Sequence, residues 1–495
     1  MKIDFYLYFN QIQVSFIMCN IRFLLSIIDV RDIIFSITAQ KIVTWLIYII
    51  IIFVLILINY ITDVFRYIVI AMKRNNIPLA IFLYSLEPLM MIFTLINTRY
   101  TKTNIDVESN IHIDRFMNRN VAIIIACHNS RDVIGKSVTS CLQHVNPEQI
   151  FVIDNGNTKD PSDDTRDVVN SVNQNINYIY YGLRGNKTIA GYIGCRLATL
   201  KGLTYALMLD DDVLLPKTFS IPTHDIGGNI VGVCYPITAI GPTNEPNILI
   251  EYQAIEYRLA DYYNRMVNQY FGVQYPHGAI SLWKIDIIEQ IYMKHDTVFH
   301  AEDMKLGLIA QKMGKRLILA DCEVQTIAPD TVFGVMPNLY TQRVRCWSMA
   351  PHIYIPKLLY AFIMFWPRTL SGILALKITQ YYTLHLIFVD WTRLPVMIIL
   401  GDKWFFWAMY AFFTVVYTLM ILIWNSFRAN TSGFHNNVSV ILTFFVYRLL
   451  QSILSTISVL FAYLVYLPNT KYAKTIPEMI KLGELSDEII LNLTL

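Results

Sequence analysis

The sequence predicts an α/β domain with a doubly wound, mainly parallel sheet, flanked on both sides by α-helical transmembrane segments. Short β-branched strands alternate with helical patterns between residues 121 and 209, and such alternation favours parallel strands joined by crossover helices. Long charge-free stretches lie outside this region, and the whole chain is 55% hydrophobic but only 16% charged.

The hydrophobic stretches define two membrane regions. Lys41–Asp63 is long enough to cross a bilayer, which predicts a span near 43–63, and residues 78–96 form a second candidate. The C-terminal region adds three apolar segments, at 379–400, 404–424 and 438–467. We therefore expect a multi-pass integral membrane protein in contact with membrane lipids. The seven scattered cysteines include no CxxC pair, which fits a cytosolic central domain.

The chain is expected to divide into membrane, soluble and membrane parts. In order, these are an N-terminal membrane region at 1–100, a soluble domain at 111–335, a connecting segment at 336–368, transmembrane helices at 369–467 and a tail at 468–495. We expect an interfacial helix at 350–368, because basic residues and Pro356 interrupt its aromatic sequence. Asp390 and Arg393 lie one helical turn apart and are expected to pair, either holding helices together or lining a channel. The net charge of +3 is too small to indicate nucleic acid as a partner.

Each expected strand of the soluble domain is a short apolar run. The four runs are Val121–Ala126, Ile150–Ile153, Asn177–Tyr181 and Ala206–Leu209, and the helical patterns between them cover Asp132–His144 and Ile189–Leu203. Doubly wound sheets bind ligands beyond the carboxyl ends of their strands. Polar clusters at 127–130, 154–158 and 210–212 are therefore expected to line one crevice.

Three consecutive aspartates, Asp210, Asp211 and Asp212, end the fourth strand. Adjacent carboxylates repel one another unless a cation neutralises them, and Mg²⁺ or Mn²⁺ prefers oxygen ligands and substrate phosphates. The triplet predicts a metal clamp for a diphosphate. A solvated acidic loop is the alternative that these residues alone leave open.

Two later motifs complete an ordered series. HAEDMKLG, at 300–307, sets an acidic pair before a helix, and QRVRCW, at 342–347, precedes the apolar segments. Over roughly Val121 to His352 the series resembles family 2 glycosyltransferases with the GT-A fold. It is more closely similar to the membrane-integrated processive synthases of the hyaluronan, chitin and cellulose type, in a less characterised eukaryotic and viral branch.

The resemblance implies a UDP-sugar donor bound at the strand ends. Asp154 would recognise uracil, and Lys187, in GNKTIAGYIGCRLA, would reach the nucleotide. Asp210 would face the nucleotide sugar, and Asp212 would bind Mg²⁺ or Mn²⁺ directly. The resemblance assigns no role to Asp211.

The resemblance also implies an acceptor side. Asp303 would be the general base, expected to be ionised at neutral pH, and the loop with His277 and Gly278 would contact a glycan or lipid acceptor. Gln342 and Arg345 match the family's QxxRW and would bind the nucleotide sugar. Trp347 would stack on the acceptor, although it lies one place later than in that motif because Cys346 precedes it.

Each residue also has a purely structural interpretation. Asp303 could stabilise a helix N-terminus, His277 could be a packing residue, and Trp347 could anchor the membrane interface. The ordered series favours a processive inverting enzyme that elongates a β-linked polysaccharide and translocates it. The alternatives are transfer of one sugar to a polyprenyl phosphate and an inactive membrane scaffold.

Overall fold

The computed structural model describes residues 77–97, 118–182, 185–243, 245–295, 301–334, 337–344, 350–365, 367, 369–399, 404–428, 438–469 and 474–493. The chain divides into two compact units. One comprises Met1–Pro78 and Pro356–Met364, and the other comprises Leu79–Ile355 and Phe365–Leu495. The second unit contains the sheets and nearly all described helices. The expected span near 43–63 lies outside the described residues.

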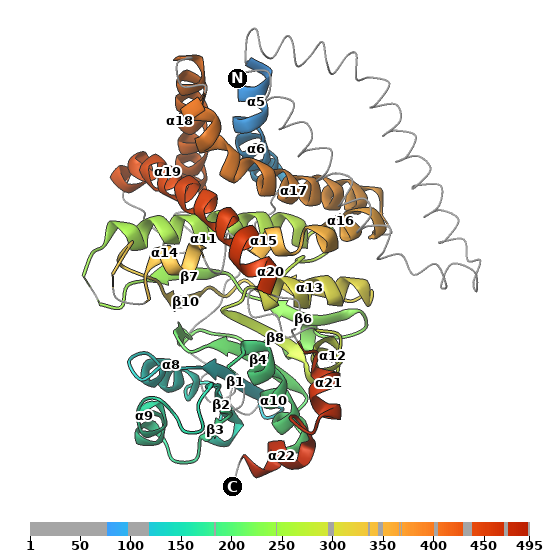
Figure 1. The fold of residues 1–495 in the computed structure, drawn as a ribbon. Coiled ribbons are helices and arrows are strands. Elements are labelled where there is room, and N and C mark those ends of the chain that lie inside the picture. Colours follow the sequence, from blue (N-terminus) through green and yellow to red (C-terminus); the bar gives the residue numbers. More distant parts are fainter. Residues whose placement is uncertain are drawn as a thin grey trace, which may run out of the picture. The chain divides into compact units, whose positions relative to one another are not determined.

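A seven-stranded sheet forms the centre of the second unit (Figure 1). In spatial order its strands are β3 (Asn177–Tyr180), β2 (Ile150–Asp154), β1 (Val121–Cys127), β4 (Tyr205–Asp210), β8 (Ile280–Lys284), β6 (Ile230–Cys234) and β9 (Arg316–Leu319). Only β8 runs antiparallel to its neighbours among these paired strands. The predicted mainly parallel sheet is confirmed, and the four expected strands end within one residue of their predicted limits.

A small second sheet begins directly after the aspartate triplet. It contains β5 (Val213–Leu214), β10 (Val324–Ile327) and β7 (Ile237–Ile240), in the order β5-β10-β7. The Ile327 amide donates to the Asp212 carbonyl at 3.1 Å, so β10 fixes the backbone of the triplet.

Helices cover both faces of the main sheet. Alternate residues of β1 enter two separate buried clusters, as the period of a strand requires. One cluster includes α8 (Ile134–Cys141), α9 (Thr165–Val172) and part of α11 (Ile248–Asn268), and the other includes α10 (Lys187–Leu200), α12 (Ile285–Tyr292) and α13 (Glu302–Lys312).

Helix α10 begins two residues earlier than its apolar pattern predicts. The Asn186 side chain caps it by accepting from the amides of Thr188, at 2.9 Å, and Ile189. Lys187 therefore occupies the first helical position. Further along, a Cβ at Gly194 would lie 2.3 Å from Ile124 Cγ2, so glycine permits the close approach of α10 to β1.

The C-terminal tail packs against the same face as α10. Its helices are α21 (Ile476–Lys481) and α22 (Asp487–Asn492), and their apolar residues join the buried cluster on that side. Arg196 of α10 donates two hydrogen bonds of 2.7 Å to the Asp487 carboxylate. The bidentate geometry fixes α22 on α10. The two helices are neighbours near the C-terminal end of the chain in Figure 1.

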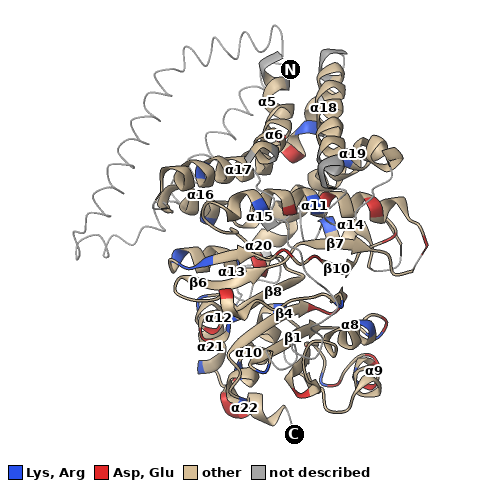
Figure 2. Ribbon diagram, turned by 180° about the vertical axis from the view of Figure 1, so that it is seen from behind, with Lys and Arg blue, Asp and Glu red and all other residues tan. Residues whose placement is uncertain are grey.

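Apolar helices lie on the other side of α11. They are α5 (Ile77–Tyr84), α6 (Leu86–Asn97), α17 (Leu370–Ile399), α18 (Trp404–Arg428) and α19 (Val438–Phe461), which continues as a π-helical turn (Ala462–Tyr466) and α20 (Leu467–Asn469). Among the described residues, two helical stretches are long and apolar enough to cross a membrane, Leu370–Arg393 and Val438–Tyr466. Charged side chains are sparse along α17, α18 and α19 (Figure 2).

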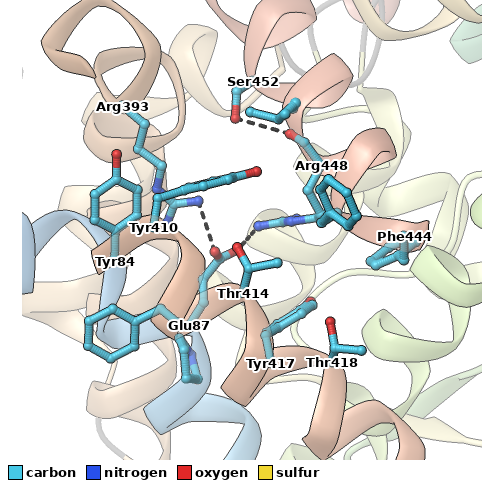
Figure 3. A pocket seen from close by; sticks show the side chains of 14 residues that line it. Tyr84, Glu87, Arg393, Tyr410, Thr414, Tyr417, Thr418, Phe444, Arg448 and Ser452 are labelled. Atoms are coloured by element: carbon cyan, nitrogen blue, oxygen red, sulfur yellow. Dashed lines mark hydrogen bonds and ion pairs between the residues drawn. The ribbon is translucent and has the colours of Figure 1, made fainter. Parts of the chain in front are cut away.

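A buried ion cluster joins three of these helices. Glu87 of α6 accepts from Arg393 of α17, with 2.8 Å between Oε2 and Nη1, and its other oxygen contacts Arg448 of α19 (Figure 3). Asp390 lies 3.5 Å from Arg393, so the predicted pair is present. Tyr84, Tyr410 and Tyr417 line the cavity beside it. Glu87 thus links both arginines, a role that the sequence pattern did not indicate.

The connecting segment contains short helices. They are α14 (Leu339–Gln342), α15 (Ala350–Ile353) and α16 (Ile355–Met364). The single helix expected at 350–368 is therefore divided at Tyr354, immediately before Pro356. Proline lacks an amide donor and cannot continue a preceding helix, but it is tolerated in the first turn of a new one, which accounts for a second helix beginning at Ile355.

Candidate active site

The carboxyl end of β2 carries a buried acid, Asp154. The Tyr178 hydroxyl donates to Asp154 Oδ2 at 2.6 Å, and His128 Nδ1 lies 3.7 Å from Oδ1. Burial raises the pKa of Asp154, and the Tyr178 hydrogen bond partly opposes this effect. Asp154 Oδ1 has no hydrogen-bond partner among the described residues. It can therefore accept a hydrogen bond from an N–H group of a ligand.

Lys187 connects the end of β4 with α13. Its ammonium contacts the Asp210 carboxylate, lies 2.9 Å from Glu302 Oε1 and donates to the Gly278 carbonyl at 2.9 Å. Burial alone would lower the pKa of Lys187, but Asp210 and Glu302 outweigh burial and raise that pKa well above its usual range. Lys187 therefore stays charged and holds the expected donor and acceptor sides together.

The three aspartates at 210–212 point to three different partners. Asp211 accepts from the Ser130 hydroxyl, which ties the loop after β1 to the triplet. Asp212 Oδ1 accepts from the Thr326 hydroxyl of β10 at 3.2 Å. Burial raises the pKa of Asp211 to about 6, and burial with the two neighbouring aspartates raises that of Asp212 well above its usual range. Asp211 thus has a structural partner that the sequence did not predict.

The surroundings of Asp212 fit a divalent cation that also binds substrate. Among the described residues, no three His, Cys, Asp or Glu side chains converge as a complete protein cage for a metal. Mg²⁺ and Mn²⁺ do not need such a cage, because they commonly use one or two carboxylates together with waters and substrate phosphates. The concentrated negative charge that raises the pKa of Asp212 is the charge that a cation would neutralise.

Asp303 lies in the first turn of α13, as expected for the acidic pair. Ala301, the residue immediately before α13, has a φ of 55°, a left-handed conformation that is uncommon for a residue with a side chain. The Met304 amide donates to Asp303 Oδ1 at 2.7 Å. Burial, followed by the charge of Glu302, raises the pKa of Asp303 to about 7. We expected an ionised carboxylate at neutral pH, and these two effects instead bring the pKa of Asp303 close to neutral pH.

The loop before β8 closes over this acid. A Cβ at Gly278 would lie 3.1 Å from Asp303 Oδ2, closer than ordinary van der Waals contact, so a side chain here would require the carboxylate to shift by a few tenths of an ångström. His277 lines the same cavity, with Lys187, Glu302 and Asp303. Burial and the Lys187 charge lower the pKa of His277 to about 4, so its imidazole is neutral at pH 7.

The QRVRCW motif is described only as far as Val344. Gln342 ends α14 and lies within hydrogen-bond reach of Tyr257 of α11, whose hydroxyl also experiences the charge of Asp212. Gln342 Oε1 is buried without a hydrogen-bond partner among the described residues. Arg345 and Trp347 lie outside the described residues.

A π-helical turn begins at Arg343 and Val344. A π turn holds about one residue more than an α turn, and such turns concentrate at functional sites. One extra residue is also the difference between this motif and QxxRW.

Part of the chain matches a known protein family, and the chain is distantly similar to several solved structures. Residues 118–350 match the family described as glycosyltransferase like family 2. Among solved structures, the chain is similar to the mannosyltransferase PcManGT from Pyrobaculum calidifontis in complex with GDP-Man and Mn²⁺, with 12% identity, a TM-score of 0.44, and 76% of this chain and 94% of that chain covered. It is also similar to S. aureus TarS 1-349, with 11% identity and a TM-score of 0.35. This match covers 70% of this chain and 91% of that chain. No curated protein sequence matches the chain.

The matched region contains the main sheet, the aspartate triplet, Asp303 and Gln342. Residues 118–350 thus match a glycosyltransferase-like family 2 domain, over just under half of the chain. The protein is an enzyme of the hexosyltransferase class.

Proposed function

We propose that the protein is a processive, inverting glycosyltransferase of the hyaluronan, chitin and cellulose synthase type, anchored in the membrane by its apolar helices. It uses a UDP-sugar to elongate a β-linked glycan and passes the product into the membrane region. The observation that carries this proposal is the Lys187 ammonium, which contacts Asp210 and lies 2.9 Å from Glu302, next to Asp303. Asp210 on the expected donor side, and Glu302 and Asp303 on the expected acceptor side, therefore share one crevice.

The nucleotide would bind at the carboxyl ends of β2 and β4. The unpartnered Oδ1 of Asp154 supports recognition of uracil, because the N3–H of that base is a hydrogen-bond donor of matching polarity. Asp212 would hold Mg²⁺ or Mn²⁺ against the diphosphate. The ion, when bound, supplies charge neutralisation for the leaving diphosphate.

The transfer step needs one base. Asp303 accepts the proton of the acceptor hydroxyl as its oxygen forms a bond to the anomeric carbon of the donor. The bond from that carbon to the phosphate oxygen breaks, and the nucleoside diphosphate leaves with the electron pair. Direct displacement inverts the anomeric centre, so an α-linked donor gives a β-linked product. Lys187 contributes one positive charge beside Asp303 throughout, between Asp210 and Glu302.

The connection to the apolar helices supports a long product. Gln342 lies within hydrogen-bond reach of Tyr257, whose hydroxyl experiences the charge of Asp212. The Ser458 hydroxyl of α19 donates to the Val344 carbonyl at 2.8 Å. The motif that would contact the growing chain is thus attached to a candidate membrane helix. The alternatives, a lipid-carrier transferase and an inactive scaffold, require no such attachment.

The test is product size. Purified protein in lipid nanodiscs is incubated with Mn²⁺ and each of several radiolabelled UDP-sugars, and the products are separated by size and by solvent extraction. We expect one donor to yield a polymer that resists extraction into organic solvent. A single sugar on an extractable lipid would replace this proposal with the lipid-carrier reaction, and turnover of no donor would support the scaffold.

A further inference from the structure

Arg343, inside the QRVRCW motif, is almost fully buried. Its guanidinium donates to both carboxylate oxygens of Glu256 on α11, at 3.1 Å from Nη1 and 2.7 Å from Nη2. A planar guanidinium that binds both oxygens of one carboxylate has a fixed direction as well as a fixed position. The backbone at Arg343 therefore has little freedom to rotate relative to α11.

Tyr447 of α19 completes this contact. Its hydroxyl donates to Glu256 Oε2 at 2.8 Å and accepts from Arg343 Nη2 at 3.3 Å. The ring is buried, so these polar atoms satisfy one another away from water. One residue later, Ser458 of the same helix donates to the Val344 carbonyl at 2.8 Å. Helix α19 thus binds two successive residues of the motif.

Helix α11 also connects this contact with the candidate site. Glu256 binds Arg343, and its neighbour Tyr257 lies within reach of Gln342 and experiences the charge of Asp212. Figure 1 shows α11 and α14 between the sheet and α19. The next residue that the motif contributes, Arg345, follows Arg343 by two positions.

We propose that Glu256, Arg343 and Tyr447 form a positioning triad that holds the described start of the QRVRCW motif, Gln342 to Val344, at an orientation set by α11 and α19. The inference rests on the proposed function. The triad itself is not assigned a contact with donor or acceptor. It fixes the backbone at Arg343 and, with Ser458, at Val344, so that Gln342 keeps its place beside Tyr257 and the acceptor end of the glycan stays aligned with the base between successive transfers.

The chain offers a matched pair of variants for testing the triad. Tyr447→Phe removes the hydroxyl that contacts Arg343 and Glu256 but keeps the ring. Tyr252→Phe removes a hydroxyl that also links α11 to α19, through Thr443 at 2.9 Å, yet does not contact Arg343. The rings of Tyr252 and Tyr447 stack with 5.5 Å between centroids, so both variants perturb one interface.

Three quantities are measured for both variants in nanodiscs: kcat and donor KM, product length, and UDP affinity with Mn²⁺. For Tyr447→Phe we expect kcat to fall on the order of tenfold and the products to shorten, because small misplacements of reacting groups are costly. Donor KM and UDP affinity should stay within about twofold, since Asp154 and Asp212 do not depend on the triad. Tyr252→Phe should behave like the wild type in all three.

Equal losses in the two variants, or no loss in either, would overturn the triad and leave a purely structural interface. A loss of UDP affinity in Tyr447→Phe would overturn it as well. Arg343→Lys gives a second measurement, because lysine keeps the charge but cannot bind both oxygens of Glu256, and it should reproduce the effect of Tyr447→Phe. A wild-type protein that makes no polymer would contradict the proposed function itself. Failure of the proposed function can therefore be distinguished from failure of the triad, which appears only when the variants are compared with an active wild type.

Discussion

The raised pKa of Asp303 gives the proposed base a testable pH dependence. Burial and the neighbouring Glu302 raise that pKa from the usual 3.8 to about 7, and Lys187 partly opposes them. A general base acts only when deprotonated, so activity should fall as the pH drops through the pKa of the base. Glu302→Gln removes one of the two causes while leaving a side chain of the same size.

The size of the effect follows from the titration. A carboxyl with a pKa near 7 is about 9% ionised at pH 6 and about 91% ionised at pH 8, a change of roughly tenfold. With the ordinary value of 3.8 the ionised fraction would be nearly constant over this range. In Glu302→Gln the like charge is gone and Lys187 remains, so the pKa of Asp303 should fall. The acidic limb of the pH profile, where activity drops as the base becomes protonated, should then move to lower pH.

The assay is the pH profile of kcat/KM for the donor, which reports ionisations of the free enzyme. Mn²⁺ is kept saturating, and the ionic strength is constant between pH 5.5 and 8.5. Glu289→Gln is the control, because Glu289 is another partly buried carboxylate, on α12, that pairs with Arg196 rather than with the crevice. Glu289→Gln should show the acidic limb of its kcat/KM profile at the same pH as the wild type.

A wild-type profile that is flat from pH 5.5 to 8.5 would refute the burial argument for Asp303. A limb near pH 7 that does not move in Glu302→Gln would show that another group titrates. Movement of the limb to higher pH would contradict the sign of the Glu302 contribution.

Four further outcomes are expected. Asp303→Asn should lower transfer on the order of 10²-fold or more while UDP affinity changes only a few-fold, and activity close to that of the wild type would remove its role as the base. Asp212→Ala should abolish the Mn²⁺-dependent part of UDP binding, measured by calorimetry, without changing UDP affinity in chelator; if the dependence survives, the ion binds elsewhere. Asp154→Ala should weaken UDP binding about tenfold or more but leave the binding of pyrophosphate with Mn²⁺ unchanged, and an equal loss for both ligands would contradict a contact to the base. Gly278→Val should lower kcat about tenfold or more because its side chain would press on the Asp303 carboxylate, whose Oδ2 already lies 3.1 Å from a Cβ at this position, and unchanged kcat would mean that the loop can retreat.

The sheet could be predicted because its signal is local. Runs such as Val121–Ala126 are apolar and β-branched, and each polar cluster follows its strand directly in the sequence. The expected strands consequently agree with the structure to within one residue.

The contacts that tune the site have no local signal. Ser130 and Asp211 are 81 residues apart, and Arg343 and Glu256 are 87 apart, so no periodicity connects them. Glu87 is a charged residue within the candidate span at 78–96, and its arginine partners lie 306 and 361 residues away, so the sequence pattern around it does not reveal the ion cluster. The pKa of Asp303 depends on burial and on Glu302 together, and only the folded chain determines both.

The docked tail has a consequence for membrane topology. Arg196 and Asp487 fix α22 on the catalytic domain, so the chain must return to the side from which it left after Val344. Any bilayer crossings between these points are therefore even in number. Three crossings by the apolar segments at 379–400, 404–424 and 438–467 would leave the tail on the wrong side. Either one of the three stays at the surface, or residues 350–368 supply a fourth crossing.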